Sequence, residues 1–157
     1  MLALLLAAVG PITGCQTDSE TTHSLVKARQ EEWTRQIRAV GADELALRQR
    51  HAALPSVTGG PAGRMGTVQG AGAAVETRGI ALRLHAEALL AGARQSLSGL
   101  ELQVKQMVER IEAAAAGDPR KAEALLEGEQ ARLREVLRML HEQLGTAEQE
   151  IRTLQKG

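Results

Sequence analysis

The chain has 157 residues, enough for one domain with a modest core, and contains one Trp but neither Phe nor Tyr. Ala, Leu, Glu, Gln and Arg dominate, a mixture that is typical of long helices and coiled coils. Nineteen basic and nineteen acidic residues cancel and are interspersed, which excludes the positive face of a nucleic-acid-binding protein and the basic amphipathic stretch of an anionic-membrane binder.

The first predicted element is a short apolar leader that ends near the only cysteine. Its first nine residues are all apolar, but they are too few for the roughly 20 residues that span a bilayer as a helix. A run of this length matches the apolar region of a secretory signal peptide, which small residues follow at the cleavage site. The residues Ile12, Thr13, Gly14 and Cys15 resemble the lipobox of a bacterial lipoprotein precursor.

This resemblance implies a lipid anchor at Cys15. It implies a signal peptide over residues 1–14, a diacylglyceryl group on the Cys15 thiol and a lipidated tether over residues 15–18. In such lipoproteins an Asp directly after the cysteine usually signals inner-membrane retention, so Gln16 favours the outer membrane, facing the periplasm. The alternative is an apolar helix start with an incidental cysteine, since no Lys or Arg precedes the apolar run.

The second predicted element is an amphipathic helix over residues 19–54. Ser19, Thr21 or Thr22 is expected to cap its N-terminus. For Trp33 we weigh a weak role in partner binding against a place as the bulkiest core residue of this helix. Alternating steps of three and four place one stripe of residues on a single helix face. The stripe consists of Val26, Trp33, Ile37, Val40, Leu47 and Leu54, with the polar Gln30, Glu44 and His51 between them.

Residues 55–72 interrupt the helical pattern with two prolines and six glycines. Gly70 and Gly72 fit the start of a G-x-G-x-x-G motif, but Val75 occupies its sixth position and no predicted strand precedes it. We therefore interpret the segment as a flexible linker rather than as a phosphate-binding loop.

Residues 73–156 are predicted to form a long antiparallel helical hairpin. Gly117 is placed to end the first arm, Asp118 to cap the second, and Pro119 to be its first helical residue. Folding at this turn pairs apolar residues whose position numbers add up to 236 or 237, the nearly constant sum that antiparallel helices require. The pairs are Ile111 with Leu125, Val104 with Leu133, Leu100 with Leu137, Leu97 with Leu140, Ala93 with Leu144, Leu89 with Ala147, Ala86 with Ile151, and Leu82 with Leu154.

These elements together predict an all-α protein: a long antiparallel helical hairpin with an additional N-terminal helix, as a three-helix bundle or a coiled coil. A first helix that stood apart as a stalk would expose its whole apolar stripe to water. Burial of that stripe favours packing of the first helix on the hairpin.

The sequence offers no constellation for catalysis or for binding a cofactor, a metal ion or a small-molecule substrate. The four histidines are spread over three predicted helices, and a pair such as Glu20 and His23 is more typical of a solvated surface than of a metal site. His85 and Glu87 match the H-x-E of zinc deaminases, but the second motif of those enzymes needs cysteines that this chain lacks. We therefore expect that the protein is not an enzyme.

Taken together, these features favour a lipid-anchored envelope protein with a structural or adaptor role. A lipid on Cys15 would hold it at the membrane, and its helical faces would contact an envelope protein partner or a second copy. The alternative is a cytosolic coiled-coil protein that oligomerises through the same stripes and carries no lipid.

Overall fold

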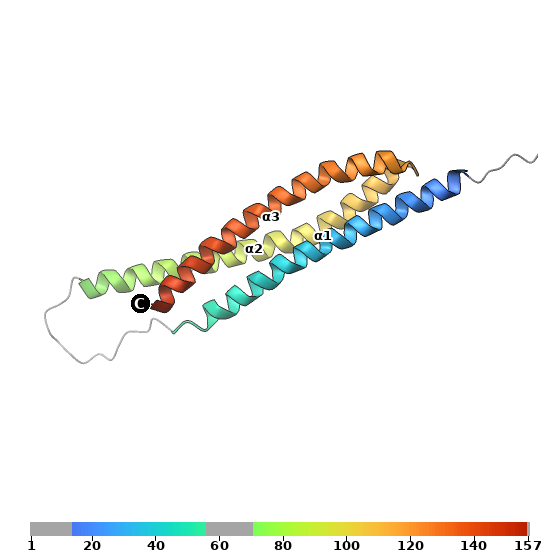
Figure 1. The fold of residues 1–157 in the computed structure, drawn as a ribbon. Helices are drawn as coiled ribbons and strands as arrows, with labels where there is room; N and C mark the ends of the chain where they lie inside the picture. Colours follow the sequence, from blue (N-terminus) through green and yellow to red (C-terminus); the bar gives the residue numbers. More distant parts are fainter. Residues whose placement is uncertain (1–13, 56–70, 157) are drawn as a thin grey trace, which may run out of the picture.

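The computed structural model describes residues 14–55 and 71–156, with side chains from residues 18 and 75 onward in these two stretches. This part of the chain forms three helices and no strand: α1 (Gly14–Ala52), α2 (Ala71–Ala115) and α3 (Pro119–Lys156). Each helix packs against the other two in an elongated bundle (Figure 1). The predicted all-α fold is confirmed, and the first helix joins the hairpin in a three-helix bundle.

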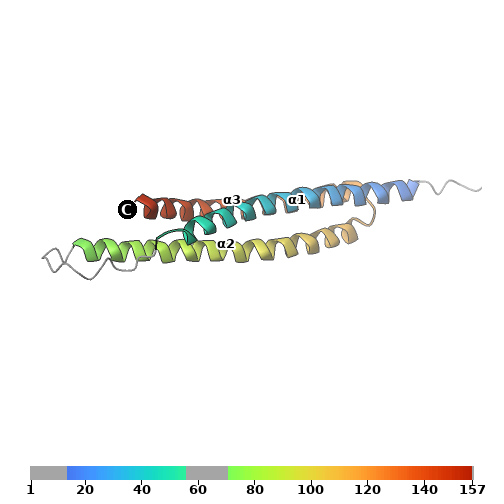
Figure 2. The same cartoon turned by 90° about the horizontal axis from the view of Figure 1, so that it is seen from below.

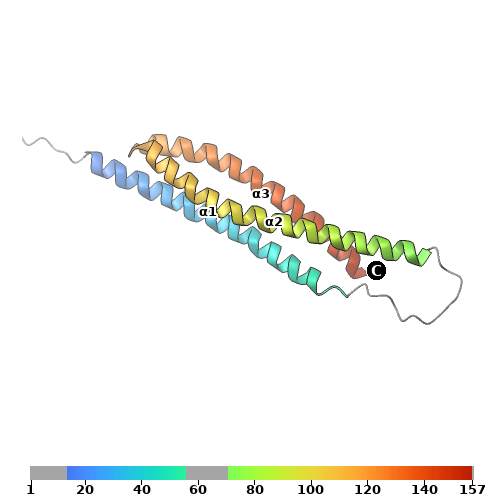
Figure 3. The same ribbon diagram turned by 180° about the vertical axis from the view of Figure 1, so that it is seen from behind.

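The helices run up, down and up along the long axis of the bundle. α1 and α3 are parallel, and α2 runs antiparallel to both (Figures 1 and 2). The start of α1 therefore lies at the same end as the turn between α2 and α3, and the C-terminus lies at the other end. At that other end α2 extends past both of its neighbours (Figure 3). At 1.5 Å per residue the 38 residues of α3 span about 57 Å.

The turn between α2 and α3 has the geometry that its sequence predicts. Gly117 has a φ of +82°, a left-handed conformation that a residue without a Cβ adopts at little cost. Asp118 accepts hydrogen bonds through Oδ1 from the backbone nitrogens of Arg120 at 3.0 Å and Lys121 at 3.3 Å. These bonds satisfy two of the free N–H groups at the start of α3, whose first residue is Pro119.

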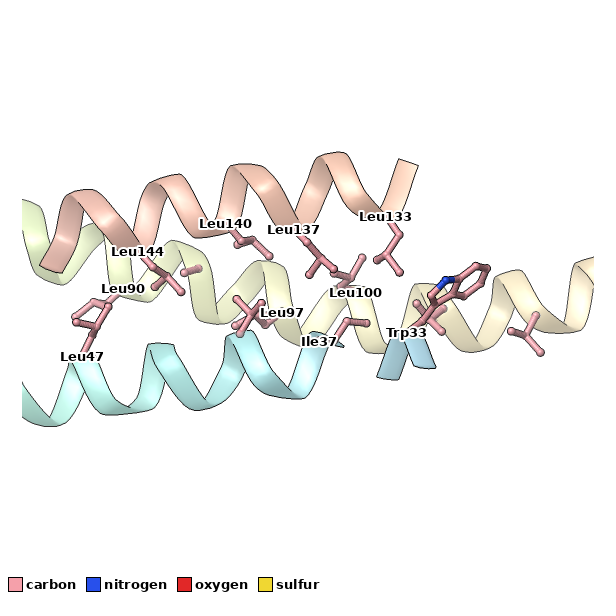
Figure 4. Close-up of a cluster of buried hydrophobic side chains, with 14 of the residues drawn as sticks. Trp33, Ile37, Leu47, Leu90, Leu97, Leu100, Leu133, Leu137, Leu140 and Leu144 are labelled. Atoms are coloured by element: carbon pink, nitrogen blue, oxygen red, sulfur yellow. The ribbon is translucent and has the colours of Figure 1, made fainter. Parts of the chain in front are cut away.

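The core is a continuous set of apolar side chains from all three helices (Figure 4). All six predicted apolar residues of the α1 stripe are buried, and most predicted residues of the hairpin are buried as well. The buried set from the hairpin is Ala86, Leu90, Ala93, Leu97, Leu100, Val104, Val108, Ile111 and Ala115 of α2, and Ala122, Leu126, Leu133, Leu137, Leu140, Leu144, Ala147 and Ile151 of α3.

Two positions of the predicted hairpin register are wrong. Leu126 is 2% exposed whereas Leu125, the predicted partner of Ile111, is 37% exposed. Leu126 lies seven positions before Leu133, so it continues the seven-residue repeat that Leu125 breaks. In α2, Leu90 is buried and Leu89 is only partly buried for the same reason.

The predicted bounds of the first helix also differ from the structure. α1 begins at Gly14, so residues 15–18, which we predict as the lipidated tether, lie in its first turn. Ser19, Thr21 and Thr22 consequently lie inside the helix and do not cap it, and the Thr22 hydroxyl donates to the carbonyl oxygen of Asp18 at 2.9 Å. Residues 1–13 of the predicted signal peptide and residues 56–70 of the predicted linker lie outside the described residues.

Candidate functional site

Cys15, the predicted lipidation site, lies in the first turn of α1. Its side chain is outside what the structure describes, so its lipidation stays a prediction. One turn further on, Ser19 lies beside the turn between α2 and α3, because a Cβ added to Gly117 would stand 3.7 Å from the Ser19 Cβ. The helix that carries Cys15 is thus packed against the hairpin from nearly its beginning.

A second contact fastens the same end of the bundle. His23 Nδ1 of α1 lies 2.9 Å from Glu112 Oε1 near the end of α2. The imidazole is largely exposed, so this pair contributes little to stability. The pair marks where the start of α1 lies beside the end of α2.

Trp33 lies in the core and offers no surface to a partner in this bundle. Its exposed fraction is 0%, and Figure 4 shows the indole pointing inward from α1. The indole Nε1 is buried and has no hydrogen-bond acceptor among the described residues. Of the two places that we weighed for Trp33, the structure shows the core position; a role in partner binding stays a prediction.

Glu44 is the most unusual polar residue of the described part of the chain. It occupies a core position of the α1 stripe, is 5% exposed, and its buried Oε1 accepts no hydrogen bond from any described residue. Arg48 Nε lies 3.6 Å from that oxygen, which makes an ion pair but is too long for a hydrogen bond. Glu44 and Arg48 line a groove between α1 and α2 together with Glu87 and Arg94.

The sequence pattern places Glu44 in the α1 stripe but indicates no role for it. A carboxylate at a core position of the stripe is itself a signal, because it must either give up its hydration or turn away from the core. Only the packed structure shows which of these happens.

We predict that Glu44→Leu raises the free energy of unfolding by about 1 kcal/mol or more, since an apolar side chain avoids the cost of burying a charge. Urea denaturation followed by circular dichroism measures the change. Glu31→Leu is the matched control, because Glu31 is exposed on the same helix, and we expect it to change stability by less than about 0.5 kcal/mol. A loss of stability in Glu44→Leu would mean that the ion pair with Arg48 outweighs the cost of burial.

The opposite end of the bundle is closed by contacts from α2. Arg83 donates to the carbonyl oxygens of Pro55 at 2.8 Å and Leu54 at 3.2 Å, which satisfies acceptors just beyond α1. His85 Nδ1 lies 2.6 Å from Glu150 Oε1 and joins α2 to α3. The histidines of both ends thus make structural contacts between helices.

Within the described residues, no three His, Cys, Asp or Glu side chains lie close enough together to hold a metal ion. Across residues 14–55 and 71–156, no helix combines the length and the apolar character needed to cross a membrane.

No protein-family model, no curated protein and no solved structure matches this chain.

Proposed function

We propose that the protein is a lipid-anchored protein of the bacterial cell envelope, held at the outer membrane on the side that faces the periplasm. The observation that carries this proposal is the lipobox-like run from Ile12 to Cys15 directly after a short apolar leader. Gln16 after the cysteine supports the outer membrane over the inner membrane by the same resemblance.

The position of Cys15 in the fold supports an anchor that orients the bundle. α1 begins at Gly14 and contacts the α2–α3 turn already at Ser19, so little chain would separate a lipid from the rod. Two or three acyl chains hold a protein firmly at a bilayer, whereas a single chain holds it only marginally. A triacylated Cys15 would therefore place the α2–α3 turn next to the membrane and the C-terminus far from it.

We further propose a structural or adaptor role for the rod. A bundle whose shortest helix, α3, is about 57 Å long gives reach without a large globular core, and its outer faces are available to another protein. We assign no catalytic residue, because the sequence brings together no nucleophile with an acid or a base. The second candidate, an unlipidated oligomerising protein, would use the same outer faces.

We predict that cells expressing the protein incorporate radiolabelled palmitate into it and that Cys15→Ala abolishes the label. The lipid attaches through the thiol, so removal of the sulfur removes the attachment point. Ser19→Ala is the matched control and should keep the label, because it changes a neighbouring residue of the same helix without touching the thiol. Mass spectrometry of the native protein should find an acylated N-terminal cysteine. An intact Met1 with a free thiol would contradict the proposal and favour the unlipidated alternative.

A further inference from the structure

The groove between α1 and α2 has the size of a small-molecule site and a charged lining. Its volume is about 580 Å³, within the roughly 300–1,000 Å³ that is usual for such sites. Ala52, Leu90 and Ala91 form the apolar part of the lining. The polar part consists of Glu44, Arg48 and His51 of α1 and Glu87, Arg94, Gln95 and Ser98 of α2. A ligand in this groove would therefore meet a small apolar surface and groups of both charges.

The carboxylate of Glu44 is the group in this groove that needs a hydrogen-bond donor. Glu44 is 5% exposed, and its buried Oε1 has no donor among the described residues. Arg48 Nε, at 3.6 Å, is too far away to supply one. A buried oxygen without a donor costs free energy, and side chains that break the packing rules of a core in this way are concentrated at functional sites. A ligand with a positively charged N–H group would supply the missing donor.

The other charges of the groove decide what else the ligand must carry. Glu87 and Arg94 on α2 are exposed and form no ion pair with another described residue. Arg48 on α1 is 40% exposed, and its long ion pair with Glu44 is its one ionic contact among the described residues. A ligand with only a positive charge would meet two guanidinium groups, and a ligand with only a negative charge would meet two carboxylates. A ligand that carries both charges can match each of them to its opposite.

We propose that the groove between α1 and α2 binds a small zwitterion that carries a primary ammonium group and a carboxylate, as a free amino acid does. The ammonium group takes the place of Arg48 beside Glu44 and donates a hydrogen bond to the buried Oε1. The Arg48 guanidinium, released from Glu44, pairs with the carboxylate of the ligand together with Arg94. Both charges of the ligand then have a partner, and so does the buried oxygen of Glu44.

A series of linear ω-amino acids tests the class of ligand and the spacing of its two charges. The probes are glycine, β-alanine, γ-aminobutyrate and ε-aminohexanoate, each titrated by calorimetry into the full chain carrying Cys15→Ala. At least one of them should bind with a dissociation constant below about 1 mM. The inference does not depend on lipidation, and the Cys15→Ala background keeps its test separate from the palmitate test. An absence of binding by all four probes would overturn the proposal.

Analogues of the tightest-binding probe test each of its charges. The N-trimethyl analogue keeps the positive charge but has no N–H group to donate, and the amine and the carboxylate of the same length each keep one charge. Each analogue should bind at least about tenfold more weakly than the probe, because it leaves one charge-assisted hydrogen bond unmade. An analogue that binds as tightly as the probe would contradict the recognition of a zwitterion.

Variants of the chain test where the probe binds. Glu44→Leu should abolish binding although we expect it to stabilise the bundle, so its effect would not come from unfolding. Arg94→Gln alters an exposed side chain and should raise the dissociation constant at least about tenfold, because it removes a charge that meets the carboxylate. The matched controls Glu31→Gln and Arg35→Gln remove exposed charges elsewhere on α1 and should leave the constant within about twofold of the parent. Binding that survives Glu44→Leu, or that falls equally in the controls, would overturn the proposal.

Discussion

Replacing Trp33 by alanine should lower the free energy of unfolding by about 3–5 kcal/mol, the largest stability loss that we expect from a single substitution in this chain. Trp33 is fully buried and is the largest side chain of the core. Its removal loses the free energy gained by burying the indole. It also leaves a cavity that the packed helices around it fill only in part. Urea denaturation followed by circular dichroism measures the change. A loss of this size is close to the whole stability of a small domain.

Trp33→Phe is the matched variant for this prediction. It keeps an aromatic ring in the core and removes the indole N–H, which has no acceptor among the described residues. We therefore expect Trp33→Phe to lower the free energy of unfolding by less than half as much as Trp33→Ala. The phenyl ring leaves a smaller cavity, and the substitution removes a buried N–H donor that has no acceptor. A loss below about 1 kcal/mol for Trp33→Ala would contradict the buried position. It would also reopen a role for Trp33 at a surface.

Leu126→Ala should lower the free energy of unfolding by about 2–5 kcal/mol, whereas Leu125→Ala should lower it by less than about 1 kcal/mol. The two residues are neighbours of the same type on one helix and differ only in the face that they occupy. Leu126 is buried and Leu125 is partly exposed. The comparison cancels the difference in helix propensity between Leu and Ala, so the remaining difference measures burial.

Thermal and urea denaturation of the two leucine variants decides the register near the α2–α3 turn. Equal losses would mean that α3 is rotated in its first turns relative to the structure. A larger loss for Leu125→Ala would restore the pairing of Leu125 with Ile111 that the sequence pattern predicts. Neither outcome would affect the rest of the hairpin, because the pairs from Val104 and Leu133 onward do not involve these positions.

The periodicity of the sequence predicts the hairpin register well where the seven-residue repeat is regular. Leu97 with Leu140 and Leu100 with Leu137 are buried on facing helices as expected. The errors at Leu89 and Leu125 arise because each is followed directly by another leucine, so an apolar residue alone does not show which of the two faces the core. Counting back seven positions from a buried leucine such as Leu133 identifies which of two neighbouring leucines faces the core.

The sequence by itself determined that the chain is helical, where the hairpin turns, and that Cys15 follows a leader resembling a lipoprotein signal. These features are local: a repeat, a Gly-Asp-Pro turn and a short motif each depend on residues close together in the chain. Only the tertiary structure decided that α1 packs on the hairpin, that Trp33 is buried and that Glu44 lacks a donor. These features depend on which helix faces meet. Helices with similar amphipathic patterns are locally equivalent, so the choice is made only when all three helices pack around one core.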